Sequence, residues 1–561
     1  MKKKKQILNQ IFLKIKKFLS LPNKPDKPIS KKTLFLLFLF FESLCLAIRL
    51  PNLLGQPPQG DEGIFLRWAD IIRENPREWL FVPGVDGKQP FFTWFVAFIG
   101  FFLSDDPWYA GRMISVFSGL ISCACIFLIS FLLFSIRTAV FSSLFYIFSP
   151  FAIMYDRMAV VDSLLATFSL LSILFTILLI DKEGWIRLPL AMGLGISIGC
   201  GFLTKAPALS FTFCSFVSIL LFSKNRKSIS LWISALFAGI IAFLIAIPYF
   251  IFSPPIMIVG ADKLFHQPSY FLSIKELLTF PYKIWLKNLY FLIGCTIGYH
   301  PFIYILMGIA LFSMIITRRK NWLLLGIFGL VPLFMIVLVA RNPFYKYFLY
   351  GFLPLYILAG NVISILLAWL KKYVSFSDIK IVPVVSIFLI SPSFYFIYHL
   401  LFSFQKVSLP KPEKERGIIE GTWPGWGTPE AISFLKEEIK EKDDVVFLLP
   451  VDWGNPADPV YLYFKKNPKV TIYEAWWWPN KIPHLIPNAS SVEMALSKYQ
   501  QKKADYLFYP KSVEDKNVYF VTSSAYTPPP YVLAQNPEFQ LIRSFPHKTH
   551  SIDIYVKYGK Q

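Results

Sequence analysis

Residues 110–134 read AGRMISVFSGLISCACIFLISFLLF, a run of 25 residues with a single charged side chain, Arg112. A helix of about 20 apolar residues is long enough to cross the ~30 Å hydrocarbon core of a bilayer. Runs of this kind recur along the chain, since 55% of its 561 residues are hydrophobic and only 16% are charged. The sequence therefore predicts an α-helical protein that crosses a membrane many times.

The distribution of positive charge also fits a protein that crosses a membrane many times. The formal net charge is +22, and the Lys and Arg residues gather in the N-terminal tail and in short connections between apolar runs. Short basic connections stay on the cytoplasmic side, so the charge indicates topology and gives no reason to expect a nucleic-acid partner. We expect an integral plasma (inner) membrane protein with a basic cytoplasmic segment at 1–32 and a transmembrane domain at 33–401.

About eleven membrane-spanning helices satisfy this rule. The short apolar segment 90–104 would extend only about 22 Å as a helix, so we expect it to lie at the membrane surface or to re-enter without crossing. Large outer loops are expected at 51–109 and 252–288. The expected spans are 33–50, 110–134, 139–155, 162–180, 188–204, 207–222, 231–251, 289–316, 321–340, 346–370 and 380–401.

The composition changes after residue 401. A helix-like segment at 428–441 precedes an apolar, strand-like run at 445–449, and such alternation is typical of α/β domains. An odd number of spans places this region outside, so we expect residues 402–561 to form an extracytoplasmic α/β domain. Further strand-like runs occur at 469–473, 506–509 and 552–556.

Cysteines and tryptophans give weaker signals. All six cysteines fall inside apolar runs, which predicts buried thiols and no disulfide framework. The C-terminal tryptophans either pack within their domain or stack on sugar rings. They are Trp423, Trp426, Trp476, Trp477 and Trp478.

Two adjacent carboxylates stand in the sequence QGDEG at 59–63, just beyond the first apolar run. Neighbouring carboxylates at a membrane boundary repel each other and lose solvation, so they need a structural or chemical reason. Asp61 could cap the helix that the following residues predict. It could instead act as a base, with Glu62 supporting acceptor binding or orienting a cation.

Several cations fall on the same expected side of the membrane as Asp61. Arg and Lys bind phosphate oxygens, and a carboxylate among cations suits a reaction in which a base activates an acceptor while the cations hold an anionic leaving group. A lipid phosphate is the natural candidate for that group. The candidate phosphate ligands are Lys88, Arg112, Lys205, Arg341 and Lys346, and the candidate acceptor or sugar contacts are Tyr345 and His266.

These side chains also have structural alternatives. Lys205 and Lys346 could reach the lipid headgroups as interfacial anchors, and Asp162 could interact with the N-terminus of the helix that it opens. Within the first span, Glu42 and Arg49 lie two turns apart on one face, and we expect them to pair or to bind polar neighbours. Isolated histidines are seldom metal ligands, so no metal site is assigned and the need for a divalent cation is left open.

Six motifs in fixed order give a more specific signal than any single residue. They are GDE at 60–62, DGKQP at 86–90, GRMIS at 111–115, RMAVVD at 157–162, GFLTKAP at 201–207 and YKYFLYGFLP at 345–354. With these motifs the chain resembles polytopic glycosyltransferases of the GT-C architecture, close to glycosyltransferase family 39. That family includes the protein O-mannosyltransferases and is related to the bacterial transferases that place aminoarabinose on lipid A.

The resemblance implies a polyprenyl-phosphate-linked sugar as donor, a site at the outer membrane–water boundary and inversion at the anomeric carbon. It also implies that Asp61 is the catalytic base, that Lys88 lies near the donor phosphate and that Asp162 lies in the site. Arg112 and Lys205 match further positions of the family.

Two positions depart from the family pattern. Gly87 replaces an acidic residue of the aminoarabinose branch, which argues against metal binding of that kind, and Phe65 replaces a tyrosine. The C-terminal region does not resemble the domains of the protein O-mannosyltransferases, so the acceptor is not identified.

The expected function is transfer of a sugar to an extracytoplasmic lipid, glycan or protein, with Asp61, Glu62 and Asp162 as the acidic residues of the site. A polytopic transporter or flippase of lipid-linked sugars is the main alternative, although such proteins place their charges near the bilayer midplane. A catalytically silent scaffold that binds a surface polymer is a third reading.

Overall fold

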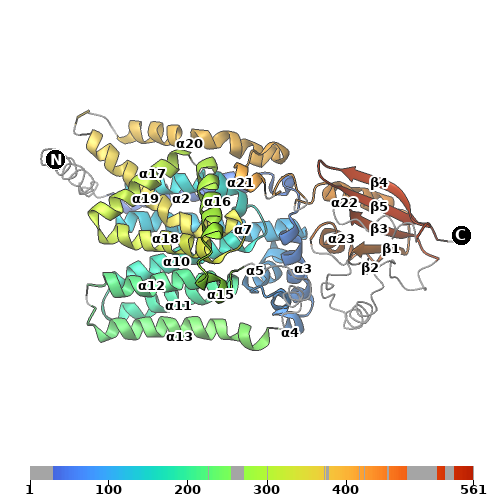
Figure 1. Ribbon diagram of the computed structural model, residues 1–561, viewed down its shortest axis with the longest axis horizontal. Coiled ribbons are helices and arrows are strands. Elements are labelled where there is room, and N and C mark those ends of the chain that lie inside the picture. The colour runs from blue at the N-terminus through green and yellow to red at the C-terminus, as the bar shows by residue number, and fades with distance from the viewer. Residues whose placement is uncertain are drawn as a thin grey trace.

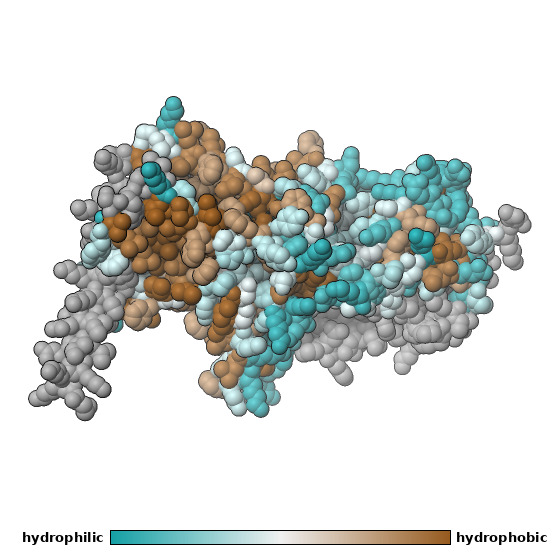
Figure 2. Space-filling view, turned by 90° about the horizontal axis from the view of Figure 1, so that it is seen from above, coloured by the Kyte–Doolittle hydropathy of each residue, from teal (hydrophilic) through white to brown (hydrophobic). Residues whose placement is uncertain are grey.

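The computed structural model describes residues 29–224, 226–253, 271–299, 301–371, 373–374, 378–415, 417–421, 424–450, 454–476, 515–524 and 536–559. The molecule is elongated, with a bundle of long helices at one end and a β-sheet domain at the other (Figure 1). Apolar residues dominate the surface of the helical end, and hydrophilic residues are more common towards the sheet (Figure 2). This distribution fits a membrane-embedded bundle that carries a solvated domain.

Within the described residues, eight helices are long and apolar enough to cross a membrane. The bent pair α8 (Ile136–Ile147) and α9 (Pro150–Asp156), with a 62° break, makes a ninth if it counts as one span. The eight are α2 (Lys31–Arg49), α7 (Pro107–Leu133), α10 (Val161–Asp181), α11 (Arg187–Thr204), α13 (Ile229–Phe252), α18 (Lys320–Val339), α19 (Leu349–Leu370) and α20 (Asp378–Phe402). The predicted polytopic helical fold is confirmed.

The remaining two of the eleven expected spans coincide with shorter apolar helices. Residues 207–222 form α12 (Ala208–Phe222), and residues 289–316 cover the second half of α16 (Tyr282–Tyr299) and most of α17 (Pro301–Thr317). The segment 90–104 contains α5 (Phe91–Phe95), a π-helical turn and α6 (Phe101–Leu103), and it is also short. Length and apolar composition therefore support eight or nine crossings in the part of the chain that the structure describes.

Helices α10 and α19 form the centre of the bundle, where most of their side chains are buried. A close approach fixes α19 against α8, because a Cβ at Gly360 would lie 2.3 Å from the Ser142 hydroxyl oxygen. Helix α13 is mostly exposed along its apolar length. In a bilayer this surface would face lipid.

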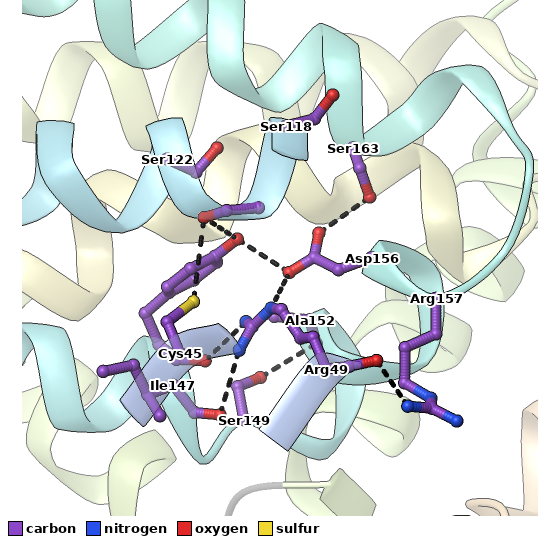
Figure 3. Close-up of polar contacts among 12 residues, drawn as sticks. Cys45, Arg49, Ser118, Ser122, Ile147, Ser149, Ala152, Asp156, Arg157 and Ser163 are labelled. Atoms are coloured by element: carbon purple, nitrogen blue, oxygen red, sulfur yellow. Dashed lines mark hydrogen bonds and ion pairs between the residues drawn. The ribbon is translucent and has the colours of Figure 1, made fainter. Parts of the chain in front are cut away.

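A buried polar cluster joins α2 to α8, α9 and α10 (Figure 3). Arg49 Nε donates to Asp156 Oδ2 at 2.8 Å, and Tyr146 and Ser163 each donate a hydroxyl to the same carboxylate at 2.7 Å. Arg157 donates to backbone carbonyls, among them Arg49 O. Of the two alternatives expected for Arg49, the structure has the polar neighbour, because α9 brings the Asp156 carboxylate to the guanidinium.

The C-terminal domain has a five-stranded mixed sheet with the order β2-β1-β3-β5-β4. Strand β1 (Val445–Pro450) pairs in parallel with β2 (Val470–Trp476) and β3 (Val518–Ser523), and β5 (Ser551–Lys557) runs antiparallel to β3 and β4 (Gln540–Pro546). Helices α22 (Thr428–Glu438) and α23 (Ala457–Phe464) complete the domain. The predicted α/β class is confirmed.

Individual elements of this domain were predicted with less success. The expected strands at 445–449, 469–473 and 552–556 are present, and the helix expected at 428–441 ends three residues early. Strands β3 and β4 and helix α23 were not predicted. The expected strand at 506–509 lies outside the described residues.

The sheet domain packs directly onto α3 (Gly60–Glu74), the helix that carries the paired carboxylates. Arg67 Nη1 lies 2.9 Å from Asp458 Oδ1, and both side chains are buried. Asn455 Nδ2 and Gly425 N both donate to Pro58 O, at 2.8 and 2.7 Å. These contacts join the C-terminal domain to the residues immediately before Asp61.

Candidate functional site

A small pocket lies where α3 meets the α9–α10 turn, the 3-10 turn η5 (Tyr345–Phe348) and the linker after α20. It encloses about 30 Å³, which is room for a water molecule or two. The lining residues are Gln59, Asp61, Tyr155, Met158, Val160, Phe344, Lys346 and Ile418.

Asp61 and Lys346 form an ion pair in this pocket. The Lys346 Nζ lies 2.5 Å from Asp61 Oδ2, and the Asp61 side chain stays 24% exposed. Burial by itself would raise the pKa of Asp61, but the positive charges of Lys346, Lys88 and Lys205 lower it to about 2. Asp61 is thus a carboxylate at neutral pH, held among three cations.

Lys88 reaches the site from a tight turn. Gly87 has a φ of 64°, a left-handed conformation that glycine adopts without strain. The Lys88 ammonium lies 2.9 Å from Asp86 Oδ2 and 5.3 Å from the centroid of the Phe65 ring, and its side chain is 33% exposed. The aromatic position noted as a departure from the family therefore contributes a cation–π contact to this lysine.

Asp162 and Lys205 form a second pair. Asp162 lies in the first turn of α10, and its Oδ1 accepts from Lys205 Nζ at 2.7 Å. The ammonium also lies 4.0 Å from the centroid of the Tyr347 ring. Burial lowers the pKa of Lys205 below its ordinary value, and Asp162 opposes that effect. The buried Asp162 Oδ2 has no hydrogen-bond partner within the described residues.

Glu62 points away from Asp61 and into the protein. It is fully buried, and its two oxygens accept from Arg112 Nε and Nη2 at 2.8 Å, from Gln59 N at 2.8 Å and from Ala159 N at 2.7 Å. The Gln59 contact belongs to a capping box at the start of α3. Glu62 therefore links the start of α3 to α7 and to the α9–α10 turn.

Arg112 is buried with Glu62, and all five of its N–H donors are used. Besides Glu62 they reach the backbone carbonyls of Leu53, Gln56 and Pro57. A role of Arg112 as a phosphate ligand does not fit this geometry, and of the two roles expected for Glu62 the contacts agree with orienting a cation, which is Arg112. Both residues stabilise the loop that presents Asp61.

Comparisons with known proteins place this architecture. Residues 87–252 match the model of the dolichyl-phosphate-mannose-protein mannosyltransferase family. The crystal structure of ArnT from Cupriavidus metallidurans bound to undecaprenyl phosphate superposes with a TM-score of 0.57 at 13% identity, covering 95% of this chain and 100% of that one. The chain has the GT-C glycosyltransferase fold.

Oligosaccharyltransferases share this GT-C fold. The apo enzyme from Archaeoglobus fulgidus matches with a TM-score of 0.54 at 10% identity, covering 89% of this chain and 70% of that one. Archaeal AglB from the same organism, in complex with an inhibitory peptide and a dolichol-phosphate, matches with a TM-score of 0.51 at 11% identity, covering 87% and 69%. No curated protein sequence matches the chain.

The match to the mannosyltransferase family model, over residues 87–252, includes Lys88, Asp162 and Lys205 but neither Asp61 nor Lys346. The structure nonetheless brings Lys88 and Lys205 close enough to Asp61 for their charges to lower the pKa of its carboxyl. The candidate site thus joins the matched segment to residues on either side of it.

Arg341 and Tyr345 have other contacts than expected. Arg341 Nη2 lies 2.6 Å from both oxygens of Glu276 on α15 (Ile274–Leu278), and its hydrogen bond, with those from Ser273, lowers the pKa of Glu276 to about 2. Tyr345 is fully buried, with its hydroxyl 3.0 Å from Thr296 Oγ1 and its ring packed on Tyr299. The Arg341–Glu276 pair is partly exposed, so a phosphate contact of Arg341 stays a prediction. The buried hydroxyl of Tyr345 does not fit the expected sugar contact.

Other expectations fall outside the site or outside the described residues. His266 lies in the segment that the structure leaves undescribed. Trp426 is buried, donates Nε1 to Ile419 O at 2.7 Å and stacks on His547, which fits the packing alternative. All six cysteines are buried and free. The described ranges contain no group of three or more His, Cys, Asp or Glu side chains that could hold a metal ion.

Sequence reasoning missed most of the pocket wall. Met158, Val160 and Phe344 are apolar and carry no chemical signal, and Ile418 comes from the linker after α20. Gln59 Nε2 donates to Ile418 O across a separation of 359 residues, at 3.2 Å. Only the fold brings such residues together.

One linker carboxylate was also missed. Glu413 on α21 (Lys411–Lys414) is fully buried and accepts hydroxyl hydrogen bonds from Tyr155 at 2.6 Å and from Tyr299 at 2.5 Å. Burial raises the pKa of Glu413 to about 7, against the effect of the two tyrosines. Because Tyr155 lines the pocket, Glu413 connects the linker to the candidate site.

Proposed function

We propose that the chain is a membrane glycosyltransferase that moves a sugar from a polyprenyl-phosphate-linked donor to an extracytoplasmic acceptor, with inversion at the anomeric carbon. The Asp61 carboxylate, paired with Lys346 in the pocket and stabilised by the charges of Lys88 and Lys205, is the observation that carries the proposal. The GT-C relatives support the donor class, since structures of ArnT and AglB contain undecaprenyl phosphate and dolichol-phosphate, respectively.

In the proposed reaction Asp61 takes the proton from an acceptor hydroxyl or amine. The acceptor atom attacks the anomeric carbon, and the bond from that carbon to the phosphate oxygen breaks. The lipid phosphate leaves with the electron pair, and Lys346 and Lys88 stabilise the charge that it gains. Attack opposite to the leaving phosphate inverts the anomeric carbon.

The ion pair between Asp61 and Lys346 also controls how strong a base Asp61 is before the donor binds. A carboxylate with a pKa of about 2 is a weak base, because Lys346 stabilises its charged form. An incoming donor phosphate competes with Asp61 for Lys346 and draws that ammonium away. Donor binding then opens the pocket and restores the basicity of Asp61 just when the acceptor needs it.

Asp162 forms an ion pair with Lys205, the third lysine of the site. Its Oδ1 anchors Lys205 at 2.7 Å, and the ring of Tyr347 limits the movement of that ammonium. In the proposed function Lys205 binds the donor phosphate or the sugar, and Asp162 positions it.

The acceptor is a lipid, a glycan or a protein. The positive-inside rule favours a cytoplasmic N-terminus in an inner membrane, and an odd number of crossings then puts the sheet domain outside.

The test is an Asp61→Asn variant of the full chain in proteoliposomes, supplied with polyprenyl-phosphate sugars and candidate acceptors. Loss of the base should slow transfer roughly 10²- to 10⁴-fold without lowering the thermal unfolding temperature. Asp105→Asn is the matched control, because Asp105 is an exposed carboxylate in the same outer region. Transfer at the parent rate by correctly folded Asp61→Asn protein would remove the assignment, and passage of intact donor across the bilayer would favour a flippase.

A further inference from the structure

A second cavity lies at the opposite end of the bundle from Asp61. It has a volume of about 310 Å³, within the range of small-molecule sites. The C-terminal end of α7, the N-terminal end of α18 and the second half of α19 form its walls. Lys346 lies in the turn η5 that leads into α19, whereas Asn361 and Ile365 of the same helix border the cavity. The two sites therefore lie at different depths of the bundle.

The position of this cavity is a membrane boundary. The helix α18 begins at Lys320 after the basic connection Arg318–Arg319, and α7 ends at Leu133. Basic connections of this kind lie on the cytoplasmic side, at the level of the lipid headgroups. The cavity therefore opens where the phosphates of the inner leaflet would lie.

The lining of the cavity is divided between polar and apolar groups. Arg319, Lys320 and Asn321 follow one another at the start of α18, and Asn361 faces them from α19. On the apolar side, Trp322 is buried and packs edge-on against Phe134, with ring centroids 6.2 Å apart. A guanidinium and an ammonium suit a phosphate, while the aromatic groups suit the glycerol and the first methylenes of an acyl chain.

Hydrogen bonds fix the side-chain amides of Asn321 and Asn361 in the cavity wall. Asn321 Nδ2 donates to Leu133 O at 2.7 Å, and Asn361 Oδ1 accepts from Thr138 Oγ1 at 3.2 Å. Lys320 Nζ lies 3.2 Å from Asp181 Oδ1, and both side chains are partly exposed. Such solvent-exposed pairs are weak, so a phosphate can compete for Lys320.

We propose that this cavity binds the phosphate headgroup of an anionic membrane lipid, with Arg319 and Lys320 as its phosphate ligands and Trp322 and Phe134 against its apolar part. A cation that merely reaches out to headgroups needs no cavity beside it. Here two consecutive cations border a walled cavity that contains apolar surface as well. The site is separate from the proposed transfer reaction and does not depend on it.

Native mass spectrometry of the purified full chain tests this site, with phosphatidylglycerol and phosphatidylcholine as probes. The parent should retain one phosphatidylglycerol at concentrations where phosphatidylcholine is lost, and an Arg319→Gln, Lys320→Gln variant should lose it by roughly tenfold or more, as expected for charge-assisted contacts. The control is Arg226→Gln, Lys227→Gln, which removes two exposed charges from the α12–α13 connection at the same end. Equal losses in both variants would show general attraction to a basic surface and overturn the site.

Two further measurements distinguish lipid binding in the cavity from a loss of folding and from binding of free phosphate. Ile365→Phe narrows the cavity without changing charge and should weaken phosphatidylglycerol retention, with an unchanged unfolding temperature as evidence of an intact fold. Retention at the parent level in a folded Ile365→Phe variant would contradict binding inside the cavity. Inorganic phosphate is the remaining probe: if it displaces phosphatidylglycerol at equal concentration, the site recognises free phosphate and the lipid assignment fails.

Discussion

The Lys346 ammonium lies 2.5 Å from the Asp61 carboxylate although 285 residues separate the two in the chain. Lys346 stands at the entry to α19, the central helix of the bundle, and Asp61 at the start of α3, beneath the sheet domain. Their pairing joins the central helix of the bundle to the outer region, beside the contacts that Glu62 makes with Arg112 and Ala159. It also makes the charge state of Asp61 depend on Lys346.

Replacing Lys346 should change both donor binding and pH dependence. In Lys346→Gln, burial of Asp61 is opposed by Lys88 and Lys205 alone, so the pKa of Asp61 should rise above its present value of about 2. The acid limb of the kcat/KM profile for sugar transfer should then move to higher pH, and donor KM should rise roughly tenfold with the loss of a charge-assisted contact. Lys406→Gln, an exposed lysine after α20, should leave both unchanged, and an unmoved acid limb in Lys346→Gln would contradict this coupling.

The Glu62–Arg112 pair should control stability. Arg112→Lys keeps one positive charge but cannot reproduce five hydrogen bonds to a carboxylate and three backbone carbonyls. Breaking a buried pair of this kind costs about 3–5 kcal/mol, so the unfolding temperature in detergent should fall markedly. Arg77→Lys, an exposed residue on α4 (Pro76–Trp79), is the control. A variant with parental stability and lost donor binding would restore Arg112 as a phosphate ligand.

The sequence predicted the helical bundle, the outer carboxylates and the α/β domain, because apolar length, charge distribution and alternation are local properties of the chain. It gave Asp61 and Glu62 different roles, but it could not show that Glu62 is buried against Arg112, since adjacent residues at the start of a helix point in different directions. It also assigned Arg112 to phosphate, because the sequence does not distinguish an arginine that is buried in an ion pair from one that binds a ligand. The wall residue Ile418 and the buried Glu413 carry no local signal, and their roles follow only from tertiary packing.

Asp162 and Lys205 should behave as one unit. The single variants Asp162→Asn and Lys205→Gln each break the 2.7 Å ion pair, and each should reduce transfer. If Asp162 acts by positioning Lys205, the double variant should be little worse than Lys205→Gln, so the interaction free energy in a double-mutant cycle should be about 1 kcal/mol or more. The measurement is kcat/KM for the donor in all four proteins. Fully additive losses would mean that Asp162 contacts the substrate independently.

Glu413 should make stability depend on pH. Its pKa is about 7 in the folded protein against an ordinary value of 4.5, so the folded state holds the proton more tightly than the unfolded state. The sign is therefore opposite to that of a salt-bridged carboxylate: stability should fall as pH rises from about 4.5 to about 7 and then level off, with a total effect of about 3 kcal/mol from this group.

Glu413→Gln removes the titration while keeping one oxygen that can accept from Tyr155 or Tyr299. The variant should be close to the parent in stability at pH 5 and relatively more stable at pH 8, which intrinsic-fluorescence unfolding of the full chain in detergent can measure across that range. Glu415→Gln changes an exposed carboxylate two residues away and should keep the parental pH dependence. If Glu413→Gln retains that dependence as well, another group is responsible for it. If instead the slope disappears in Glu413→Gln alone, the linker carboxylate beside Tyr155 is the group whose ionisation loosens the contact between the C-terminal linker and the pocket wall.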